Sequence, residues 1–452
     1  METTYDVRIW KTRVYEGTRG TTYYVRWSVA GRERKEAFKG KALSEGFRAE
    51  LVTAARKGEA FDVESGLPVS MRRANRDMSW YELACAFADM KWPRVAATTR
   101  RTHAEALTAM TTALFTTERG KPDAQRIRVA LSRWAFNTAH RESSPADVKA
   151  VLRWVEKNTR PVSALAKPEV LRPMLDGLTV RLDGKPAAPS VVSRRRKILN
   201  TAVEYAVERK LLNANPIPAL KWTPPRTTHT VDRRSVANPV QVRSLLEAVR
   251  KLQRSGPRLV AFYGCLYFAA MRPEEAVALA KHHLVLPVDG WGEFNLSTAE
   301  PHAGREWTDS GENRDRRQLK QRARGEVRTV PCPPELTALL NAHIEEFGTA
   351  ADGRLFCGER NEGEMPKGTI NRTWRKAREK VFTPEVAASP LAATPYDLRH
   401  AAVSTWLNGG VPATQAAEWA GHSVEVLLKI YAKCLDGGAQ QLRQRISDAL
   451  GY

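Results

Sequence analysis

Two polar stretches without helical or strand periodicity interrupt this sequence, at residues 65–77 and 221–235. The first is basic, and the second is rich in proline, threonine and arginine. The chain, at 452 residues, is also longer than one hydrophobic core usually supports. The sequence therefore predicts a multidomain protein with three parts, which span residues 1–64, 78–222 and 238–452.

The first part contains short runs rich in β-branched and aromatic residues, separated by glycine turns and followed by a helical stretch at 41–57. We expect a three-stranded sheet packed on one helix. Basic and aromatic side chains alternate along it: Arg8, Lys11, Arg13, Arg26, Arg32, Arg34 and Lys35 with Tyr23, Tyr24 and Trp27. This pattern fits either a solvated charged face or a sheet that reads the major groove of DNA.

The second part has the apolar spacing of helices throughout. The expected helices cover 80–90, 96–115, 123–139, 145–157, 168–178 and 190–210. The last one carries four cations in its first turns: Arg194, Arg195, Arg196 and Lys197. A helix dipole disfavours positive charge at that end. A phosphate backbone nearby explains the cluster better than helix stability does, and an ordinary solvated face is the alternative.

The third part mixes helices with a strand pair around 293–297 and 316–330, so the whole protein is expected to be mainly α with small β elements. Near its end, an apolar stripe of Leu442, Ile446 and Leu450 predicts an amphipathic terminal helix.

The charge balance of the chain points to a nucleic acid partner. Lys+Arg 72 against Asp+Glu 50 leaves a net charge of +22, which suits a polyanion. The five cysteines are scattered without a C-x-x-C pattern, which argues against a disulfide framework and against a zinc site. With neither a signal-peptide pattern nor an apolar run of membrane-spanning length, we expect a cytoplasmic protein without a membrane partner.

Arg272 is placed at a corner between two apolar helices, and Pro273 suits the first position of the second helix. A buried corner is a costly place for a cation. The alternatives are a salt bridge to Glu275 alone and a role in binding phosphate.

A basic segment at 316–331 reads as a local hairpin with a glycine-containing turn. It carries Lys320 and three further cations expected to contact DNA: Arg322, Arg324 and Arg328.

The most specific pattern lies between residues 395 and 431. Arg399 follows Tyr396 by three positions and precedes His400 directly. Gly421 is expected to close a helix as its left-handed cap, and it presents His422 on the turn. Tyr431 follows that histidine by nine residues.

In order and spacing, these residues resemble the tyrosine recombinases, the phage integrase family. The resemblance implies that Arg272 and Arg399 hold the scissile phosphate and that His422 assists them. It implies that Tyr431 attacks phosphorus and that Lys320 protonates the departing 5′-oxygen.

The sequence departs from the family pattern at Tyr396, where the family has a histidine. Tyrosine can donate a hydrogen bond to phosphate but is a poor base near neutral pH. His400 is an adjacent candidate for that role, and a purely structural histidine is the alternative.

The resemblance further implies an arm-type DNA-binding domain at 1–64, a helical core-binding domain at 78–222 and a catalytic domain with a C-terminal helix at 238–452. It implies an integrase of the type found in actinobacterial phages and integrative elements. Such an enzyme acts as a homo-tetramer on double-stranded attachment sites, without cofactor or metal, and excision or host DNA-bending factors can assist it. A type IB topoisomerase and a non-catalytic DNA-binding regulator are the competing interpretations.

Overall fold

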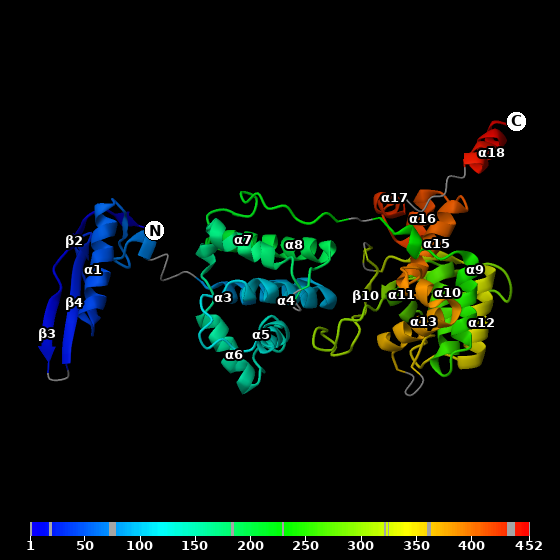
Figure 1. Cartoon of the computed structure of the whole chain (residues 1–452), viewed down its shortest axis with the longest axis horizontal. Helices are drawn as coiled ribbons and strands as arrows, with labels where there is room; N and C mark the ends of the chain where they lie inside the picture. The colour runs from blue at the N-terminus through cyan, green and yellow to red at the C-terminus, as the bar shows by residue number, and fades with distance from the viewer. Residues whose placement is uncertain are drawn as a thin grey trace.

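The computed structural model describes residues 2–17, 20–71, 78–181, 185–227, 230–320, 322–323, 325–358, 363–431 and 439–451. These residues form a mainly helical molecule with four small antiparallel sheets (Figure 1). Among the helices so described, none combines the length and the apolar character needed to cross a bilayer.

The N-terminal unit has a four-stranded sheet of β2 to β5, covered on one face by α1 (Lys41–Arg56), and a separate pair of short strands, β1 and β6. Its strands are β1 (Thr3–Thr4), β2 (Val7–Ile9), β3 (Arg13–Gly17), β4 (Gly20–Val29), β5 (Arg32–Phe38) and β6 (Phe61–Asp62). The expected three-stranded sheet is wrong, because β4 is long enough to pair with β2 and β3 as well as β5. Strand β3 has almost entirely exposed residues and so lacks the apolar alternation that would reveal it. Trp27, grouped above with the exposed aromatic residues, lies in the core beneath α1.

The second unit packs its helices around one apolar core. They are α3 (Trp80–Lys91), α4 (Ala97–Thr112), α5 (Ala124–Val129), α6 (Ala146–Lys157), α7 (Pro168–Gly177) and α8 (Pro189–Glu208). Ser79 and Glu82 form a capping box that fixes the start of α3. The single helix expected at 123–139 is α5 followed by a π-helical turn that ends at Ala135.

The third unit is built around α10 (Ser255–Phe268), a helix that packs against α9, α12, α13 and α15. Its helices are α9 (Pro239–Arg250), α10, α11 (Pro273–Val277), α12 (Pro334–Phe347), α13 (Lys367–Val381), α14 (Pro384–Ala388), α15 (Tyr396–Asn408), α16 (Ala413–Ala420), α17 (Val424–Tyr431) and α18 (Ala439–Leu450). Its strands are β7 (Leu284–Val285), β8 (Gly292–Leu296), β9 (Thr298–Ala299), β10 (Arg317–Gln318) and β11 (Arg328–Cys332).

The hairpin expected within 316–331 does not form. Strand β10 pairs with β9, whereas β11 pairs with β8, so that Arg328 lies opposite Leu296. Lys320 consequently lies in a turn after β10. The reason is that β8 supplies a longer partner for β11 than the two-residue β10 can.

The connection between β9 and β10 leaves the third unit and packs into the second. This strap, residues 300–315, places Trp307 in the apolar core of the helical unit, against Trp92. Arg100 of α4 donates from Nη1 to Asp309 Oδ1 at 2.7 Å and from Nη2 to Oδ2 at 2.9 Å. It also donates to the Trp307 carbonyl at 3.0 Å. The strap therefore joins the two units through buried contacts.

Candidate active site

Arg272 sits at the corner where α10 gives way to α11, as the sequence predicted, and is 7% exposed. Two residues earlier, Ala270 adopts a left-handed conformation with φ of 47°. That turn aims the Ala270 carbonyl at Arg399, which donates to it from Nη1. The corner thus brings the first arginine beside the backbone that holds the second.

Glu275 holds Arg272 in place together with a second arginine. Its Oε1 accepts from Arg272 Nη1 at 2.6 Å and from Arg328 Nη1 at 2.9 Å. Its Oε2 accepts from the Arg272 backbone at 2.9 Å and from Arg328 Nη2 at 2.7 Å. Burial by itself would raise the pKa of Glu275, but Arg328 and then Arg272 outweigh it and hold that pKa well below its ordinary value. The carboxylate is therefore ionised at neutral pH.

Arg328 was expected on a DNA-facing surface, and the structure corrects this. Its side chain is 1% exposed, and both terminal nitrogens donate to Glu275. The sequence predicts a DNA contact because Arg328 lies in a basic segment. The pairing of β11 with β8 instead buries its side chain. This is the site residue whose position sequence reasoning missed.

The Gly421-His422 turn forms as expected. Gly421 caps α16 in the left-handed region, with φ of 64°, and its carbonyl accepts from Arg272 Nη2 at 2.7 Å. Ser423 then caps the start of α17 by accepting from the Val426 amide at 3.3 Å. His422 is thereby fixed between two helices beside both arginines.

Arg399 is fully buried on the first turn of α15. Its Nη2 lies 2.9 Å from His422 Nε2 and also donates to the Ala420 carbonyl. Burial, followed by the charges of Arg399 and Arg272, lowers the pKa of His422 to about 3. His422 is therefore neutral at pH 7 and presents Nε2 as an acceptor to the arginine.

Tyr431 ends α17 and is completely buried. Its hydroxyl lies 2.9 Å from Nδ1 of His400. The rings of Tyr431 and His422 stack with centroids 6.2 Å apart. The structure thus joins Arg272 with four residues of the segment 399–431 in one cluster: Arg399, His400, His422 and Tyr431.

No family model and no curated protein matches the sequence. Several solved structures are similar to it. An integrase of the transposon Tn1549, in complex with a circular intermediate DNA, shares 16% identity with a TM-score of 0.48, over 70% of this chain and 98% of that chain. The XerH site-specific recombinase, bound to a palindromic difH substrate, shares 12% identity with a TM-score of 0.45, over 83% and 96%. A lambda integrase tetramer bound to a Holliday junction shares 13% identity with a TM-score of 0.44, over 91% and 95%.

Of two further expected site residues, Lys320 stands apart from the cluster and Tyr396 borders it. Lys320 is exposed, and within the described part of the chain no hydrogen bond or ion pair links it to the cluster. Tyr396 places its ring against His400, with centroids 5.1 Å apart in an edge-on arrangement. Tyr396 therefore packs beside the histidine that contacts the Tyr431 hydroxyl.

The other cations expected to contact DNA differ in their exposure and in their partners. Arg194 and Lys197 are exposed on α8, and Arg196 is half-buried. Arg195 instead turns inward and donates to the carbonyls of Leu178 and Val180 at 3.1 and 2.9 Å, so it braces the connection from α7. Arg322 forms an ion pair with Glu326. Arg324 lies outside the described residues.

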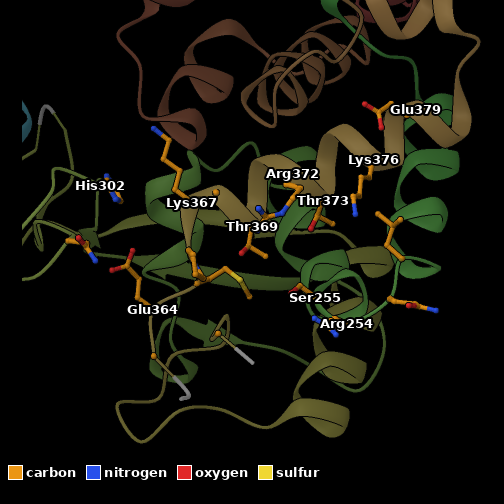
Figure 2. Close-up of a pocket in the computed structure, with 18 of the residues that line it drawn as sticks. Arg254, Ser255, His302, Glu364, Lys367, Thr369, Arg372, Thr373, Lys376 and Glu379 are labelled. Carbon is orange, nitrogen blue, oxygen red and sulfur yellow. The ribbon is translucent and has the colours of Figure 1, made fainter. Parts of the chain in front are cut away.

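A basic groove of 1440 Å³ runs along α13, and none of the five clustered residues lines it. Figure 2 shows Lys367, Arg372 and Lys376 along this helix, with Arg254 across the cavity. Its described lining has three glutamates and seven basic residues: Lys251, Arg254, Arg305, Lys367, Arg372, Lys376 and Lys380. The excess positive charge suits a phosphate backbone.

Over the described residues, no group of histidine, cysteine and carboxylate side chains has the arrangement of a metal site.

Proposed function

We propose that this chain is a site-specific tyrosine recombinase, an integrase that cleaves and rejoins DNA for a phage or other mobile element. The observation that carries the proposal is the contact network that runs from Arg272 through Gly421, and from Arg399 through His422, to the buried ring of Tyr431. Two guanidinium groups, a neutral imidazole and a phenol suit attack on a phosphodiester.

In the proposed reaction, Tyr431 attacks the scissile phosphate and forms a 3′-phosphotyrosyl bond. Arg272 and Arg399 stabilise the charge that builds on the non-bridging oxygens. The 5′-oxygen departs with a proton from Lys320, which the loop after β10 must bring to the DNA. A 5′-hydroxyl from the partner duplex then attacks the phosphotyrosine, so the energy of the phosphodiester bond is retained and no external energy source is needed.

DNA binding is assigned to three basic surfaces: the basic groove, the start of α8 and the open face of the N-terminal sheet. Exchange between two duplexes requires four strand cleavages, each by one Tyr431, and therefore four protomers. The arm-type role of 1–64, the core-binding role of 78–222 and the catalytic role of 238–452 belong to the same proposal, as do accessory bending or excision factors.

The proposal is tested by covalent trapping. The full chain is incubated with a randomised pool of nicked duplexes, and SDS-stable adducts are selected, sequenced and mapped by peptide mass. We expect the DNA to be attached at Tyr431 through its 3′-phosphate, and Tyr431→Phe to bind DNA normally without forming an adduct. A 3′-adduct that persists in Tyr431→Phe would overturn the assignment.

The same selected duplexes separate the competing functions. Relaxation of supercoils without site preference would indicate a topoisomerase, whereas binding without any adduct would indicate a regulator. For a recombinase, Arg272→Ala and Arg399→Ala should each slow cleavage by roughly 10²-fold or more, as expected when the transition state is deprived of one donor.

A further inference from the structure

Attack by a tyrosine requires that its hydroxyl lose a proton, and a free phenol has a pKa of about 10. A second tyrosine, Tyr396, cannot accept that proton at neutral pH. We propose that His400 is the catalytic base of strand cleavage, and that its Nδ1 takes the proton of the Tyr431 hydroxyl as the phenolic oxygen attacks phosphorus. This role depends on the proposed function, because the proton need only leave if Tyr431 is the nucleophile.

The geometry favours His400 over the other histidine in the cluster. His400 Nδ1 and the Tyr431 oxygen are 2.9 Å apart, within hydrogen-bond reach for proton transfer. His422 stacks on the same phenol, but its Nε2 already faces Arg399 Nη2 at 2.9 Å. An imidazole nitrogen that accepts from an arginine has no lone pair left for a second proton. The two histidines therefore have different partners: His422 accepts a hydrogen bond from Arg399, and His400 contacts the hydroxyl of Tyr431.

His400 is in the protonation state that a base needs. Burial lowers its pKa to about 4, and among its charged neighbours Asp397 raises that pKa while Arg399 lowers it. The other titratable groups that face it are Tyr396 on its own helix, Tyr431 on α17 and His422 on the preceding turn. With His400 neutral at pH 7, the proton belongs on Nε2, which leaves Nδ1 free to accept from the phenol.

Arrival of DNA strengthens this base. The scissile phosphate brings negative charge beside an imidazole that accepts or donates no hydrogen bond with a carboxylate of the described residues, and a nearby anion favours the protonated form. In the step itself, the bond from the Tyr431 oxygen to phosphorus forms and the bond from phosphorus to the 5′-oxygen breaks. The phenolic proton moves to His400 Nδ1, and the leaving 5′-oxygen takes a different proton from Lys320. In the religation step, His400 returns its proton to Tyr431.

Three variants test the role in single-turnover cleavage of the selected nicked duplex. His400→Asn keeps an acceptor near the position of Nδ1 but cannot hold the proton, and His400→Ala removes the ring. His282→Ala is the control, since His282 is an exposed histidine of the same unit. We expect both His400 variants to bind DNA normally and to slow cleavage by about 10² to 10⁴-fold, the range for loss of a general base. The His282 variant should cleave at the wild-type rate.

Two readouts separate a base from a residue that only packs. Wild-type cleavage should slow as the pH falls through the His400 pKa in the DNA complex, whereas His400→Asn should lose that inflection and speed up with hydroxide concentration instead. Added imidazoles should rescue His400→Ala, with rates that increase with the basicity of the imidazole. Wild-type rates in His400→Asn, or variants that bind DNA and stay folded but keep the inflection and resist rescue, would overturn the role. Either result, with Tyr431 adducts intact in the parent enzyme, leaves the recombinase assignment standing.

Discussion

At the scale of single residues, the Glu275 carboxylate is the most heavily committed group in the site, because four donors from Arg272 and Arg328 converge on it. Neutralising it would leave Arg328 buried without its partner. We therefore predict that Glu275→Gln lowers the free energy of unfolding by about 3–5 kcal/mol, the scale for breaking a buried ion pair. Urea unfolding measures this decrease. Glu274→Gln is the matched control and should unfold like the parent, since Glu274 is half-exposed.

The same carboxylate predicts how stability depends on pH. Because the folded protein lowers the pKa of Glu275 below its ordinary value of 4.5, the ion pairs contribute fully above that value. Their contribution disappears progressively as the pH falls from 4.5 toward the lower folded pKa. Urea midpoints measured at decreasing pH should fall more steeply for the parent than for Glu275→Gln. Parallel curves would show that Glu275 does not act through its charge.

The backbone of Gly421 lies directly against the side chains of Arg328 and Arg272. It has φ of 64°, and a Cβ there would overlap Arg328 Nη1 and lie 3.3 Å from Arg272 Nη1. We predict that Gly421→Ala destabilises the fold by more than the roughly 1–2 kcal/mol of left-handed strain alone, and also slows cleavage. Gly58→Ala isolates the strain, because Gly58 follows the end of α1 with φ of 68° and has open space around it. Equal destabilisation of both variants, measured by thermal unfolding, would rule out an effect of the clash with the arginines.

At the scale of elements, the N-terminal sheet has one apolar and one basic face. The register places Arg8, Arg13 and Lys35 on the face opposite the buried Trp27, and all three are exposed. We predict that changing these three to alanine weakens binding to full-length sites. The slope of log affinity against log salt should decrease by roughly three, about one for each phosphate that the sheet no longer neutralises. Cleavage of a short core site should be unchanged.

The control removes the same charge from the helical side of that unit. It changes three exposed cations of α1 and its end: Lys41, Arg56 and Lys57. If this variant loses as much affinity as the sheet variant, net charge and not the sheet face accounts for binding.

Helix α18 presents large apolar side chains to solvent, with Ile446 59% and Leu450 60% exposed. Two such residues four positions apart need a partner surface, and docking on a neighbouring protomer supplies one. We predict that Ile446→Asp with Leu450→Asp weakens tetramer formation on paired sites in native gels without lowering the melting temperature. Gln444→Ala, on the opposite side of the helix, should assemble normally. Normal assembly by the double variant would place this helix against its own protomer.

The elements differ in how far the sequence reveals them. The Gly421-His422 turn depends on neighbours a few positions away, so a glycine cap and the next helix start predict it. Burial of Arg328 depends instead on Glu275, 53 positions earlier, and on a strand pairing that skips a long insertion. The contact between His400 and Tyr431 arises from the docking of α15 and α17, which no sequence spacing specifies.

At the scale of the whole molecule, the strap fixes the helical unit to the third unit. Arg100 is buried under Trp92 and paired with Asp309, so its removal should free the strap. We predict that Arg100→Ala makes the connection at 221–235 more sensitive to protease and enlarges the radius of gyration in X-ray scattering. Arg94→Ala, an exposed cation nearby, should leave both unchanged. An unchanged scattering profile in Arg100→Ala would show that the remaining contacts of the strap, those of Trp307, Ala303 and Glu306, suffice.

The complete burial of Tyr431 has a consequence for the cell that houses the enzyme. On the proposed mechanism, a copy that binds chromosomal DNA at random keeps the Tyr431 hydroxyl behind protein, so we expect contact with a random phosphate not to cut the strand. The rate of DNA cleavage should then follow the number of complete recombination complexes and not the total amount of the protein. We therefore expect DNA breakage to depend on the step that uncovers the Tyr431 hydroxyl.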